Sequence, residues 1–403
     1  MKPRVALVTH DFGGGGGTAT MTRFLHRVLS ESGRFEPQII SLAVSASDSN
    51  SVLLRSPRTW IRGVRRAESF RGGIPYLQVG AMFSEFEYQR YRPRFLLTEM
   101  LNDYDLVQFV VGTPPLMCVA ARVKKPKFLW TATMVRPDRA SRNEQARKLR
   151  RLWAAVMTPL AERYERSGLQ IASEVFALSN YTLDAVRKVL GPDAGILAPC
   201  GVDTEVFQPA PGAGKGQYIL CVGRLDDPRK NTALLVEAYA RLRRKFPDSP
   251  ELWLVGPQPP PQTLHLINEH GLSQFVRLLG AQKTAELPKL YQSALFFVLS
   301  SDEEGLGLVI LEAMACGLPV VSTACGGPET AVEHERTGLL VPTNDAEALS
   351  AAMGRLLSSP SLCASMGKAG RTAALDRFSI AATGRVFIEK YEEVIHAGNN
   401  GNA

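Results

Sequence analysis

The 403-residue sequence contains no run of eighteen consecutive apolar residues. A membrane-spanning helix needs about 20 predominantly apolar residues, so we expect none in this chain. The apolar run at residues 5–8 is also too short for a secretory signal peptide, and it leads straight into glycines. These absences predict a cytoplasmic protein, with peripheral contact at the inner face of the membrane left open.

Cysteine is scarce and scattered, at Cys118, Cys200, Cys221, Cys316, Cys325 and Cys363. No Cys-x-x-Cys pair occurs, and the six histidines form no cluster with the spacing of metal ligands. We therefore expect reduced, buried thiols and no metal site. Asp103 and Asp105 have a spacing that can hold a divalent metal, but they directly precede an apolar run, where capping a strand is the favoured role.

Acidic residues are outnumbered only in the first half of the chain. Residues 1–210 hold 29 Lys and Arg against 19 Asp and Glu, whereas the remainder holds 18 against 20. The formal net charge of +8 therefore comes from the first half alone. A basic half favours an anionic ligand or an anionic membrane surface as its partner. We expect no nucleic-acid partner.

Short apolar runs alternate with helical stretches in both halves, which is typical of parallel, doubly wound sheets. Strands are predicted at residues 4–9, 37–44, 106–110, 128–133, 174–179, 218–222, 251–256, 275–280, 295–299 and 320–323. Residues 208–216 are rich in Pro and Gly and predict an interdomain linker. The length also suggests two domains. The expected fold class is therefore α/β, with two Rossmann-like, doubly wound domains.

A glycine loop follows the first predicted strand. His10 precedes five glycines at residues 13–17, and a helix is predicted from about Thr18. Such a loop lets backbone N–H groups approach a phosphate. It fails as a dinucleotide fingerprint, because the third glycine position holds Thr18 and the strand 37–44 ends without an acidic residue for a ribose hydroxyl. A nicotinamide-dependent oxidoreductase is therefore disfavoured.

Two carboxylates lie around the helix predicted at residues 308–316. Glu304 lies just before the N-terminus of this helix, where an acidic side chain can simply complement the helix dipole. Glu312 interrupts the apolar helix itself, where a carboxylate is rarely buried without a partner. A helix would place the two about 12 Å apart along its axis. For Glu304, a structural role and a role in binding a ligand both remain open. For Glu312, a role in binding a ligand is favoured.

Two cations lie at another strand–helix junction. Arg224 follows the strand 218–222, and Lys230 opens the next helix. Together they suit a diphosphate, with the guanidinium binding in a bidentate manner and the ammonium acting as a point charge. The alternative is that both are surface cations paired with Asp226 or Asp227.

Three segments resemble one known family, the retaining GT-B glycosyltransferases of family 4. They are residues 304–321 (EGLGLVILEAMACGLPVV), residues 223–231 (GRLDDPRKN) and residues 196–209 (ILAPCGVDTEVFQP). The resemblance implies two domains facing across a cleft. Residues 1–208 would bind the acceptor, residues 209–375 would bind the nucleotide sugar, and a helix at 376–396 would cross back to the first domain.

The resemblance also implies roles for individual residues. Glu304 would contact the donor sugar, Glu312 would hold the ribose hydroxyls, and Arg224 and Lys230 would stabilise the diphosphate. Glu304, Arg224 and Lys230 are thus the expected catalytic residues. Further donor contacts are expected from Gly305, Leu306, Gly307, Leu308, Gly15, Gly16 and Gly17, and acceptor contacts from His10, Thr18 and Thr133.

The sequence departs from the family pattern at three places. Asn231 replaces the usual glycine after the lysine, and Cys200 replaces the usual asparagine. Many relatives carry a histidine near the donor sugar in the region of residues 131–134, and this sequence has none there. The missing histidine implies either a different donor sugar or weakened activity.

The implied function is a metal-independent, cofactor-free hexosyl transfer with retention of anomeric configuration, in which the nucleotide sugar is a substrate. A UDP-sugar is the first expectation, because uridine donors dominate the family. A hydrolase that pairs Glu304 with Glu312 would need their carboxylates about 5–9.5 Å apart and would leave the cation junction unexplained. Another alternative is a catalytically weak relative that binds a nucleotide or glycan as a partner subunit.

Two basic segments raise the question of a membrane surface. Residues 56–71 place Trp60 and Ile61 among several arginines and would be amphipathic as a helix. Residues 139–151 form a second basic cluster. The alternative for both is an exposed segment whose arginines are merely solvated.

Overall fold

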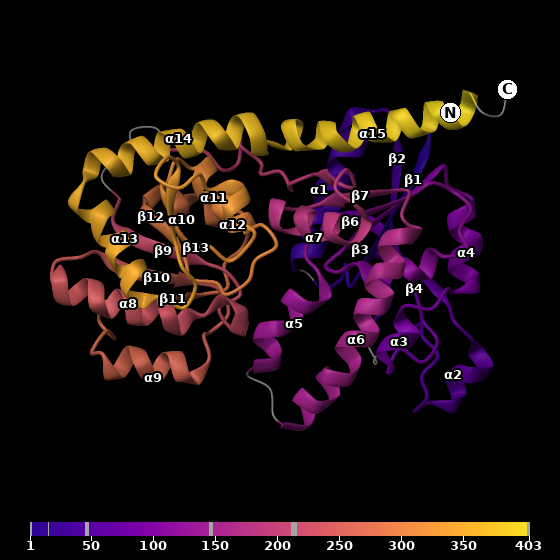
Figure 1. Ribbon diagram of the computed structural model, residues 1–403, viewed down its shortest axis with the longest axis horizontal. Coiled ribbons are helices and arrows are strands. Elements are labelled where there is room, and N and C mark those ends of the chain that lie inside the picture. The colour runs from indigo at the N-terminus through magenta and orange to yellow at the C-terminus, as the bar shows by residue number, and fades with distance from the viewer. Residues whose placement is uncertain (1, 15, 45–47, 145–147, 211–215, 401–403) are drawn as a thin grey trace. The chain divides into compact units, whose positions relative to one another are not determined.

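The computed structural model describes residues 2–14, 16–44, 48–144, 148–210 and 216–400. The side chains of residues 140–152 and 398–400 lie outside this description. The chain divides into two compact units, shown in Figure 1. Unit 1 comprises Met1–Leu178, Thr182–Pro199 and Gly384–Ala403, and unit 2 comprises Ser179–Tyr181 and Cys200–Thr383.

Within the described residues, unit 1 is built on an eight-stranded sheet with the order β3-β4-β2-β1-β5-β6-β7-β8. Its strands are β1 (Arg4–His10), β2 (Glu36–Leu42), β3 (Arg66–Arg71), β4 (Ile74–Val79), β5 (Leu106–Val111), β6 (Lys127–Thr131), β7 (Glu174–Ala177) and β8 (Ile196–Leu197). β3 pairs antiparallel with β4, and the other described pairings are parallel. β5 is buried along its whole length, as expected for a continuous apolar run inside a parallel sheet.

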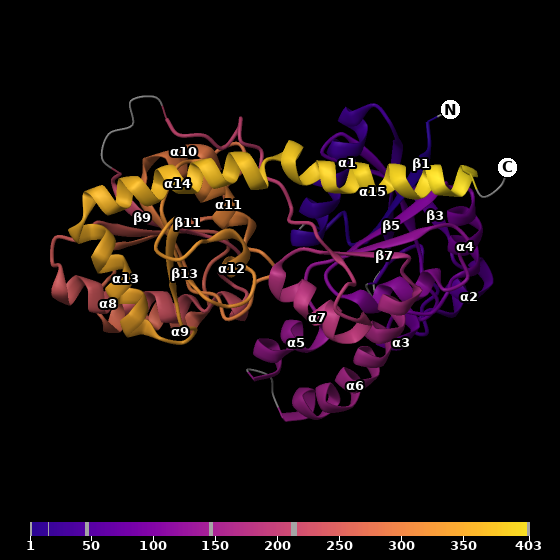
Figure 2. The same ribbon diagram turned by 45° about the horizontal axis from the view of Figure 1, so that its top comes forward.

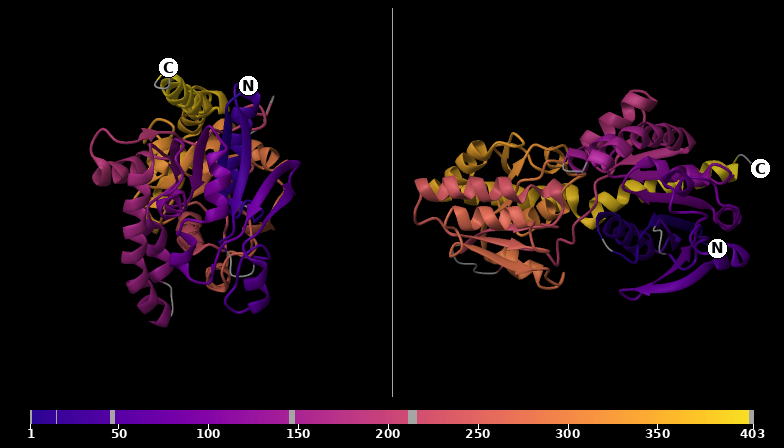
Figure 3. Two further views of the ribbon diagram at one scale, coloured as in Figure 1. Left: turned by 90° about the vertical axis from the view of Figure 1, so that its right-hand side faces the viewer. Right: turned by 90° about the horizontal axis from the view of Figure 1, so that it is seen from below.

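The helices of unit 1 connect and cover these strands. They are α1 (Gly17–Ser32), α2 (Pro57–Arg62), α3 (Glu87–Arg90), α4 (Phe95–Asn102), the 3₁₀ helix η1 (Pro114–Ala120), α5 (Val135–Glu144), α6 (Lys148–Ile171) and α7 (Asn180–Leu190). The long helix α6 packs on η1, and its N-terminal half projects away from the sheet (Figures 1 and 3).

Unit 2 is built on a six-stranded parallel sheet in the described chain, with the order β11-β10-β9-β12-β13-β14. Its strands are β9 (Tyr218–Val222), β10 (Glu251–Val255), β11 (Val276–Gly280), β12 (Ala294–Leu299), β13 (Val320–Thr323) and β14 (Gly338–Val341). The central strand β9 is buried throughout.

Helices cover both faces of the second sheet. The helices of unit 2 are the 3₁₀ helix η2 (Pro228–Lys230), α8 (Thr232–Lys245), α9 (Pro261–Glu269), α10 (Leu287–Ser293), α11 (Leu308–Ala315), α12 (Pro328–Ala331), α13 (Ala346–Ser358) and α14 (Pro360–Phe378). The last helix of the chain, α15 (Ile380–Asn400), begins in unit 2 and continues in unit 1. Figure 2 shows α8, α9 and α13 on one side of the strands and α10, α11 and α14 on the other. The prediction of two doubly wound α/β units is thus confirmed.

The predicted strands all occur, within one or two residues of their expected ends. β3, β4, β8 and β14 were not expected. The helical interpretation of residues 56–71 is wrong for its second half. α2 ends at Arg62, because Gly63 adopts a positive φ of 71°, and Arg66–Arg71 then forms the edge strand β3.

Two other expectations meet the limits of the described residues. Most of the predicted linker 208–216 lies outside them, at 211–215. The side chains of the basic cluster 139–151 also lie outside the described part of the structure, except for that of Arg139, which is paired with Glu87. No helix among the described residues is long and apolar enough to cross a membrane. The six cysteines are buried, and none forms a disulfide within the described chain.

The C-terminal helix α15 belongs to unit 1 from Gly384 onward. The ring of Phe387 packs on that of Trp130 with a centroid distance of 4.7 Å. The hydroxyl of Tyr391 donates a 2.7 Å hydrogen bond to Oε1 of Gln108 on β5, and both side chains are fully buried. These contacts anchor the helix to the core of unit 1.

We expect Tyr391→Phe to destabilise unit 1 by about 1–3 kcal/mol, because Oε1 of Gln108 would lose its partner inside the core. The melting temperature should fall by roughly 2–4 °C per kcal/mol. Tyr181→Phe is the matched control, because the Tyr181 side chain is 42% exposed. Equal melting temperatures of Tyr391→Phe and wild type would show that this hydrogen bond does not contribute to stability.

Candidate functional site

The order of strands in unit 2 creates a switch point. From β9 the chain passes to β10 and β11 on one side, and then returns to the other side of β9 for β12, β13 and β14. The loops that follow β9 and β12 therefore leave the sheet in different directions at the carboxyl ends of adjacent strands. Open α/β sheets bind ligands at this position. These two loops carry Arg224, Lys230 and Glu304.

The loop after β9 is organised by Asp227. Its carboxylate accepts hydrogen bonds from the Arg229 side chain at 2.8 Å and 3.1 Å and forms a 2.9 Å ion pair with Arg224. Burial raises the pKa of Asp227, but hydrogen bonds and charge from Arg229, with a smaller contribution from Arg224, outweigh burial and lower it to about 2. Asp227 is thus ionised at neutral pH. The expected alternative, in which Arg224 pairs with a neighbouring aspartate, is what this loop shows.

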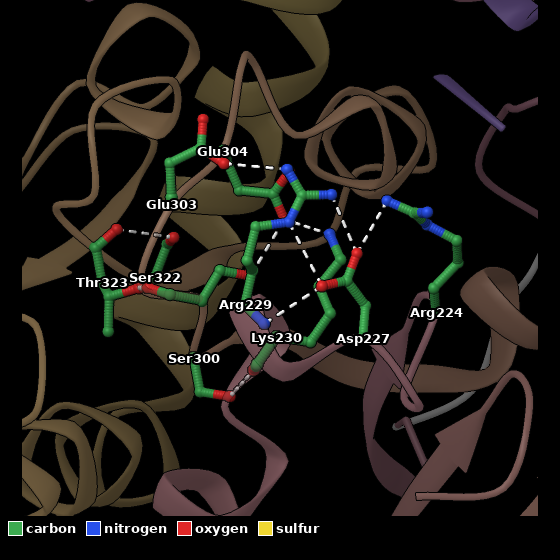
Figure 4. A network of polar contacts seen from close by, with 10 residues as sticks. Arg224, Asp227, Arg229, Lys230, Ser300, Glu303, Glu304, Ser322 and Thr323 are labelled. Carbon is green, nitrogen blue, oxygen red and sulfur yellow. Dashed lines mark hydrogen bonds and ion pairs between the residues drawn. The ribbon is translucent and has the colours of Figure 1, made fainter. Parts of the chain in front are cut away.

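Arg229 links the two loops. Its NH1 atom lies 3.0 Å from Oε2 of Glu303, on the loop after β12, and its side chain is only 13% exposed. Figure 4 shows its guanidinium between the carboxylates of Asp227 and Glu303. Sequence reasoning selected the neighbouring Arg224 and Lys230 and missed Arg229. A run of charged residues gives no signal of which one is buried.

Lys230 and Glu304 are brought together, although they lie 74 residues apart in the chain. The ammonium of Lys230 forms an ion pair with Oε1 of Glu304, and both side chains are largely buried. Oε1 of Glu304 also accepts a 2.9 Å hydrogen bond from the hydroxyl of Ser301. A second contact between the two loops supports the same geometry, since Ser300 Oγ donates to the backbone carbonyl of Lys230 at 3.0 Å.

Asn231 explains one departure from the family pattern. It adopts φ 41° and ψ 54°, the left-handed region that favours glycine and that asparagine tolerates best among the other residues. Its side chain also caps α8 by accepting a hydrogen bond from the backbone N–H of Leu234 at 3.2 Å. Asparagine therefore satisfies the backbone requirement of this position and adds a cap.

The loop from Glu304 to Leu308 is held against the turn before α12. The N–H of Gly327 donates to the carbonyl of Glu304 at 3.0 Å, and a Cβ atom at Gly327 would lie 2.5 Å from the nitrogen of Leu306. Only glycine permits this approach. Leu306 is buried, Gly305 and Leu308 are half-buried, and Gly307 caps α11 with a φ of 79°. The N–H of Gly326 is already bound to the carboxylate of Glu329 at 2.9 Å.

Glu312 has its own partner, away from the Arg229 contacts. Its Oε2 accepts a 2.7 Å hydrogen bond from the hydroxyl of Tyr291, a fully buried residue of α10. Burial raises the pKa of Glu312 to about 7, and the hydrogen bond from Tyr291 opposes that rise. A carboxyl group whose pKa is raised in this way is a candidate functional residue.

The remaining predicted site residues lie in unit 1. Thr18 is on α1, Thr133 follows β6, and His10 ends β1. Gly16 has a φ of 94°, Gly17 begins α1, and Gly15 lies outside the described residues. The glycine loop is held by Arg71, which donates to the carbonyl of Phe12 at 2.8 Å and to that of Gly13.

Asp103 and Asp105 lie beside the start of β1. Oδ2 of Asp105 accepts a 2.7 Å hydrogen bond from the backbone N–H of Arg4, and the carbonyl of Asp103 accepts one from the Arg4 guanidinium. The pair therefore has the strand-capping role favoured by the sequence. No group of three potential metal ligands occurs among the residues that the structure describes.

Comparison with known proteins finds a family match within unit 2. Residues 216–359 match the family described as glycosyl transferases group 1. The chain is 35% identical over 241 residues to the GDP-mannose-dependent alpha-(1-6)-phosphatidylinositol monomannoside mannosyltransferase of Mycolicibacterium smegmatis, covering 55% of this chain and 63% of that protein. It is 32% identical over 223 residues to the D-inositol 3-phosphate glycosyltransferase of Saccharomonospora viridis, covering 51% and 52%. The chain thus spans between half and two thirds of the length of these relatives.

Solved structures share the fold over nearly the whole chain. Sucrose-phosphate synthase from Thermosynechococcus elongatus superposes with a TM-score of 0.75 at 22% identity, covering 98% of this chain and all of that one. Anabaena Alr3699/HepE, solved with UDP and glucose, gives a TM-score of 0.69 at 18% identity, covering 97% of this chain and all of that one. At such identities the likeness concerns the fold alone. Residues 216–359 thus match the group 1 glycosyl transferases, and the two α/β units have the GT-B fold.

Proposed function

We propose that the protein transfers a glycosyl group from a nucleoside diphosphate sugar to an acceptor hydroxyl, with retention of anomeric configuration. The observation that carries this proposal is the meeting of Lys230 and Glu304 at the switch point of unit 2, beside Arg224 and Arg229. A diphosphate needs cations, and a sugar needs a carboxylate to orient its hydroxyls.

The chemistry of the step assigns roles to these groups. Negative charge grows on the departing diphosphate while the sugar acquires oxocarbenium character. Arg224 is 56% exposed and held from one side by Asp227, so its remaining N–H groups are accessible to a phosphate. Lys230 is held by Glu304 next to the same loop. Glu304, in turn, would accept hydrogen bonds from the hydroxyls of the donor sugar.

A GDP-sugar is the proposed donor. The relatives from Mycolicibacterium smegmatis and Mycobacterium tuberculosis, at 33–35% identity, are named as GDP-mannose-dependent. The HepE structures contain UDP or UDP-glucose, but that likeness is at 18–19% identity and concerns the fold. The expectation of a uridine donor therefore gives way to guanosine diphosphate as the first donor to test.

Hydrolysis by a pair of carboxylates gains no support from the contacts. Glu304 is bound to Lys230 and Ser301, whereas Glu312 is bound to Tyr291. We propose that Glu312 holds the ribose hydroxyls of the nucleotide instead. No side chain was identified from the sequence as a nucleophile beneath the sugar, so a front-face route assisted by the diphosphate is the proposed mechanism. An inverted anomer in the product, read by NMR, would contradict it.

Lys230→Met should weaken the binding of GDP-mannose by roughly 10- to 150-fold. This is the loss expected when a charge-assisted hydrogen bond of about 1.5–3 kcal/mol disappears. The substitution also leaves Glu304 unpaired near the diphosphate. Isothermal titration calorimetry of GDP-mannose, GDP, UDP and UDP-glucose measures the affinity and the base preference together.

The matched control is Lys283→Ala, because Lys283 is an exposed residue of the same unit. Its affinity for the nucleotide should equal that of the wild type. Binding that is unaffected by Lys230→Met, or no binding of any nucleotide, would contradict the proposed donor site. Turnover of a bound donor by the wild type would also exclude the partner-subunit alternative.

Donor binding should strengthen as the pH rises through about 7. Burial raises the pKa of Glu312 to about 7, so its carboxyl group is protonated at lower pH and accepts hydrogen bonds from ribose better once ionised. Between pH 6 and pH 8 the dissociation constant of GDP-mannose should fall by up to about 10-fold. GDP-mannose is the suitable probe, because its sugar ester removes the terminal phosphate ionisation that free GDP has in this range.

Glu312→Gln should bind GDP-mannose more weakly and show a flat pH profile. Glu286→Gln, at an exposed carboxyl of the same unit, should keep the slope of the wild type. If Glu312→Gln retained the full slope, the titrating group would be another residue and the ribose role of Glu312 would be wrong.

We further propose that unit 1 contacts an anionic membrane through the surface at α2. Trp60, Ile61, Leu54 and Met82 are 51%, 95%, 46% and 54% exposed, and they lie together because Trp60 donates to the carbonyl of Leu53 and packs on Phe83. Exposed arginines accompany them at Arg55, Arg58, Arg65 and Arg66. Exposed apolar side chains among cations fit a lipid surface with acidic headgroups.

Ile61→Ser should reduce binding to vesicles of phosphatidylcholine containing added phosphatidylserine, measured by flotation. The substitution removes apolar surface that is almost fully exposed, so the fold should be unaffected. Leu278→Ser, at an apolar residue of unit 2 that is 43% exposed, is the control. Equal flotation of wild type with and without the anionic lipid would refute the membrane contact.

A further inference from the structure

Unit 1 has a switch point of its own, and a cavity lies there. β2 and β4 follow on one side of β1, and β5 lies on its other side. His10 ends β1, Thr113 follows β5 and Val135 follows β6, so these residues mark the carboxyl edge of the sheet. They line a cavity of about 420 Å³ within unit 1, a size common for small-molecule sites. The complete lining is His10, Val44, Glu87, Arg90, Tyr91, Thr113, Leu116, Val135, Asp138, Arg139, Trp153 and Ala154.

The charges of this cavity neutralise one another. Arg139 forms an ion pair with Glu87, and these side chains are only 18% and 10% exposed. Glu87 also accepts a 2.9 Å hydrogen bond from the hydroxyl of Tyr91. Arg90 donates to the carbonyl of Ser84 at 2.8 Å. With Asp138, the described lining of the cavity carries two acids and two guanidinium groups, so these residues supply no net charge that would attract a phosphate. A phosphate would have to displace Glu87 from Arg139 in a poorly solvated place.

His10 gives the cavity an uncharged polar group. Burial lowers the pKa of His10, with Asp11 and Asp138 opposing that shift, so the imidazole is neutral at physiological pH. Its Nδ1 atom is shut off from solvent and has no hydrogen-bond partner among the described residues. The imidazole is part of the cavity lining and is an uncharged polar group that a ligand there can meet. A hydroxyl group suits it, because a hydroxyl can either donate or accept.

Aromatic and aliphatic side chains form the other walls. Trp153, on α6, is 53% exposed, and Tyr91, Leu116 and Val135 are also in the lining. Trp presents a rigid apolar face with a polar edge. Paired charges, a neutral imidazole and an aromatic face together suit a ring that carries hydroxyl groups on its rim and C–H groups on its faces.

We propose that this cavity binds an uncharged, polyhydroxylated ring, which forms the accepting end of the acceptor. Glu87 and the arginines exchange hydrogen bonds with its hydroxyls, His10 binds one hydroxyl through its imidazole, and Trp153 covers one face. The sequence led us to expect His10 on the acceptor side, but it also favoured an anionic acceptor. Any phosphate or lipid of the acceptor would lie outside this cavity. The assignment to the acceptor rests on the proposed glycosyl transfer.

The test uses the full-length protein and saturation-transfer NMR. The probes are methyl α-mannoside, methyl α-glucoside and myo-inositol, each compared with its phosphorylated counterpart. At least one neutral probe should bind to the wild type and bind about fivefold or more weakly to Trp153→Ala and to His10→Phe. Phe95→Ala, at an aromatic residue of the same unit that is 78% exposed, is the matched control and should bind as the wild type does.

Three outcomes would overturn the proposal: no neutral probe binds, a phosphorylated probe binds more tightly than its neutral partner, or Trp153→Ala and His10→Phe bind as the wild type does. GDP-mannose titrations of the same variants separate this proposal from the proposed donor site. Normal nucleotide binding with lost sugar binding is the expected result for Trp153→Ala and His10→Phe. Absent nucleotide binding in the wild type would refute the glycosyl transfer, while a neutral-ring site would still stand on its own.

Discussion

Parallel strands deliver their carboxyl ends to one edge of a sheet, and this constraint places both candidate sites. In unit 2 the loops after β9 and β12 diverge because the chain reverses its direction of winding between them. β1 and β5 stand in the same relation in unit 1. Lys230 and Glu304 lie at the first switch point, and His10 and Thr113 at the second. The candidate site residues of both units therefore lie at the carboxyl edges of the sheets, where the strand order reverses.

The charged contacts of unit 2 are poorly explained by stability alone. A largely buried ion pair contributes little net stability, because desolvation offsets the attraction between the charges. What the contacts do is fix positions. Arg229 keeps Asp227 ionised, and Asp227 holds Arg224 at 2.9 Å, while Glu304 holds Lys230. Cations positioned before a ligand arrives do not have to reorganise when charge develops on it, which is the main requirement of electrostatic catalysis.

The sequence was informative where burial imposes a pattern. The core strands of unit 2 could be predicted because strands buried on both faces are continuous apolar runs. The edge strand β3 could not, because its residues alternate between exposed and half-buried positions and form no continuous apolar run. The family resemblance supported Lys230 and Glu304 as separate site residues, but no local pattern predicted that they pair with each other. Arg229 was missed because its burial depends on Glu303, 74 residues later.

The excess of positive charge in the first half of the chain bears on ligand binding only through the residues that are exposed. Buried and exposed arginines therefore have to be considered separately. Part of it is structural. Arg94 is buried and donates to the carbonyls of Gly80 and Ala43, and Arg71 holds the glycine loop. Within the cavity of unit 1, the positive charge of Arg139 is neutralised by its ion pair with Glu87. The exposed remainder includes the arginines around α2, where apolar side chains accompany them. Net charge therefore describes the outer surface of unit 1, whereas selection inside its cavity depends on hydrogen bonds.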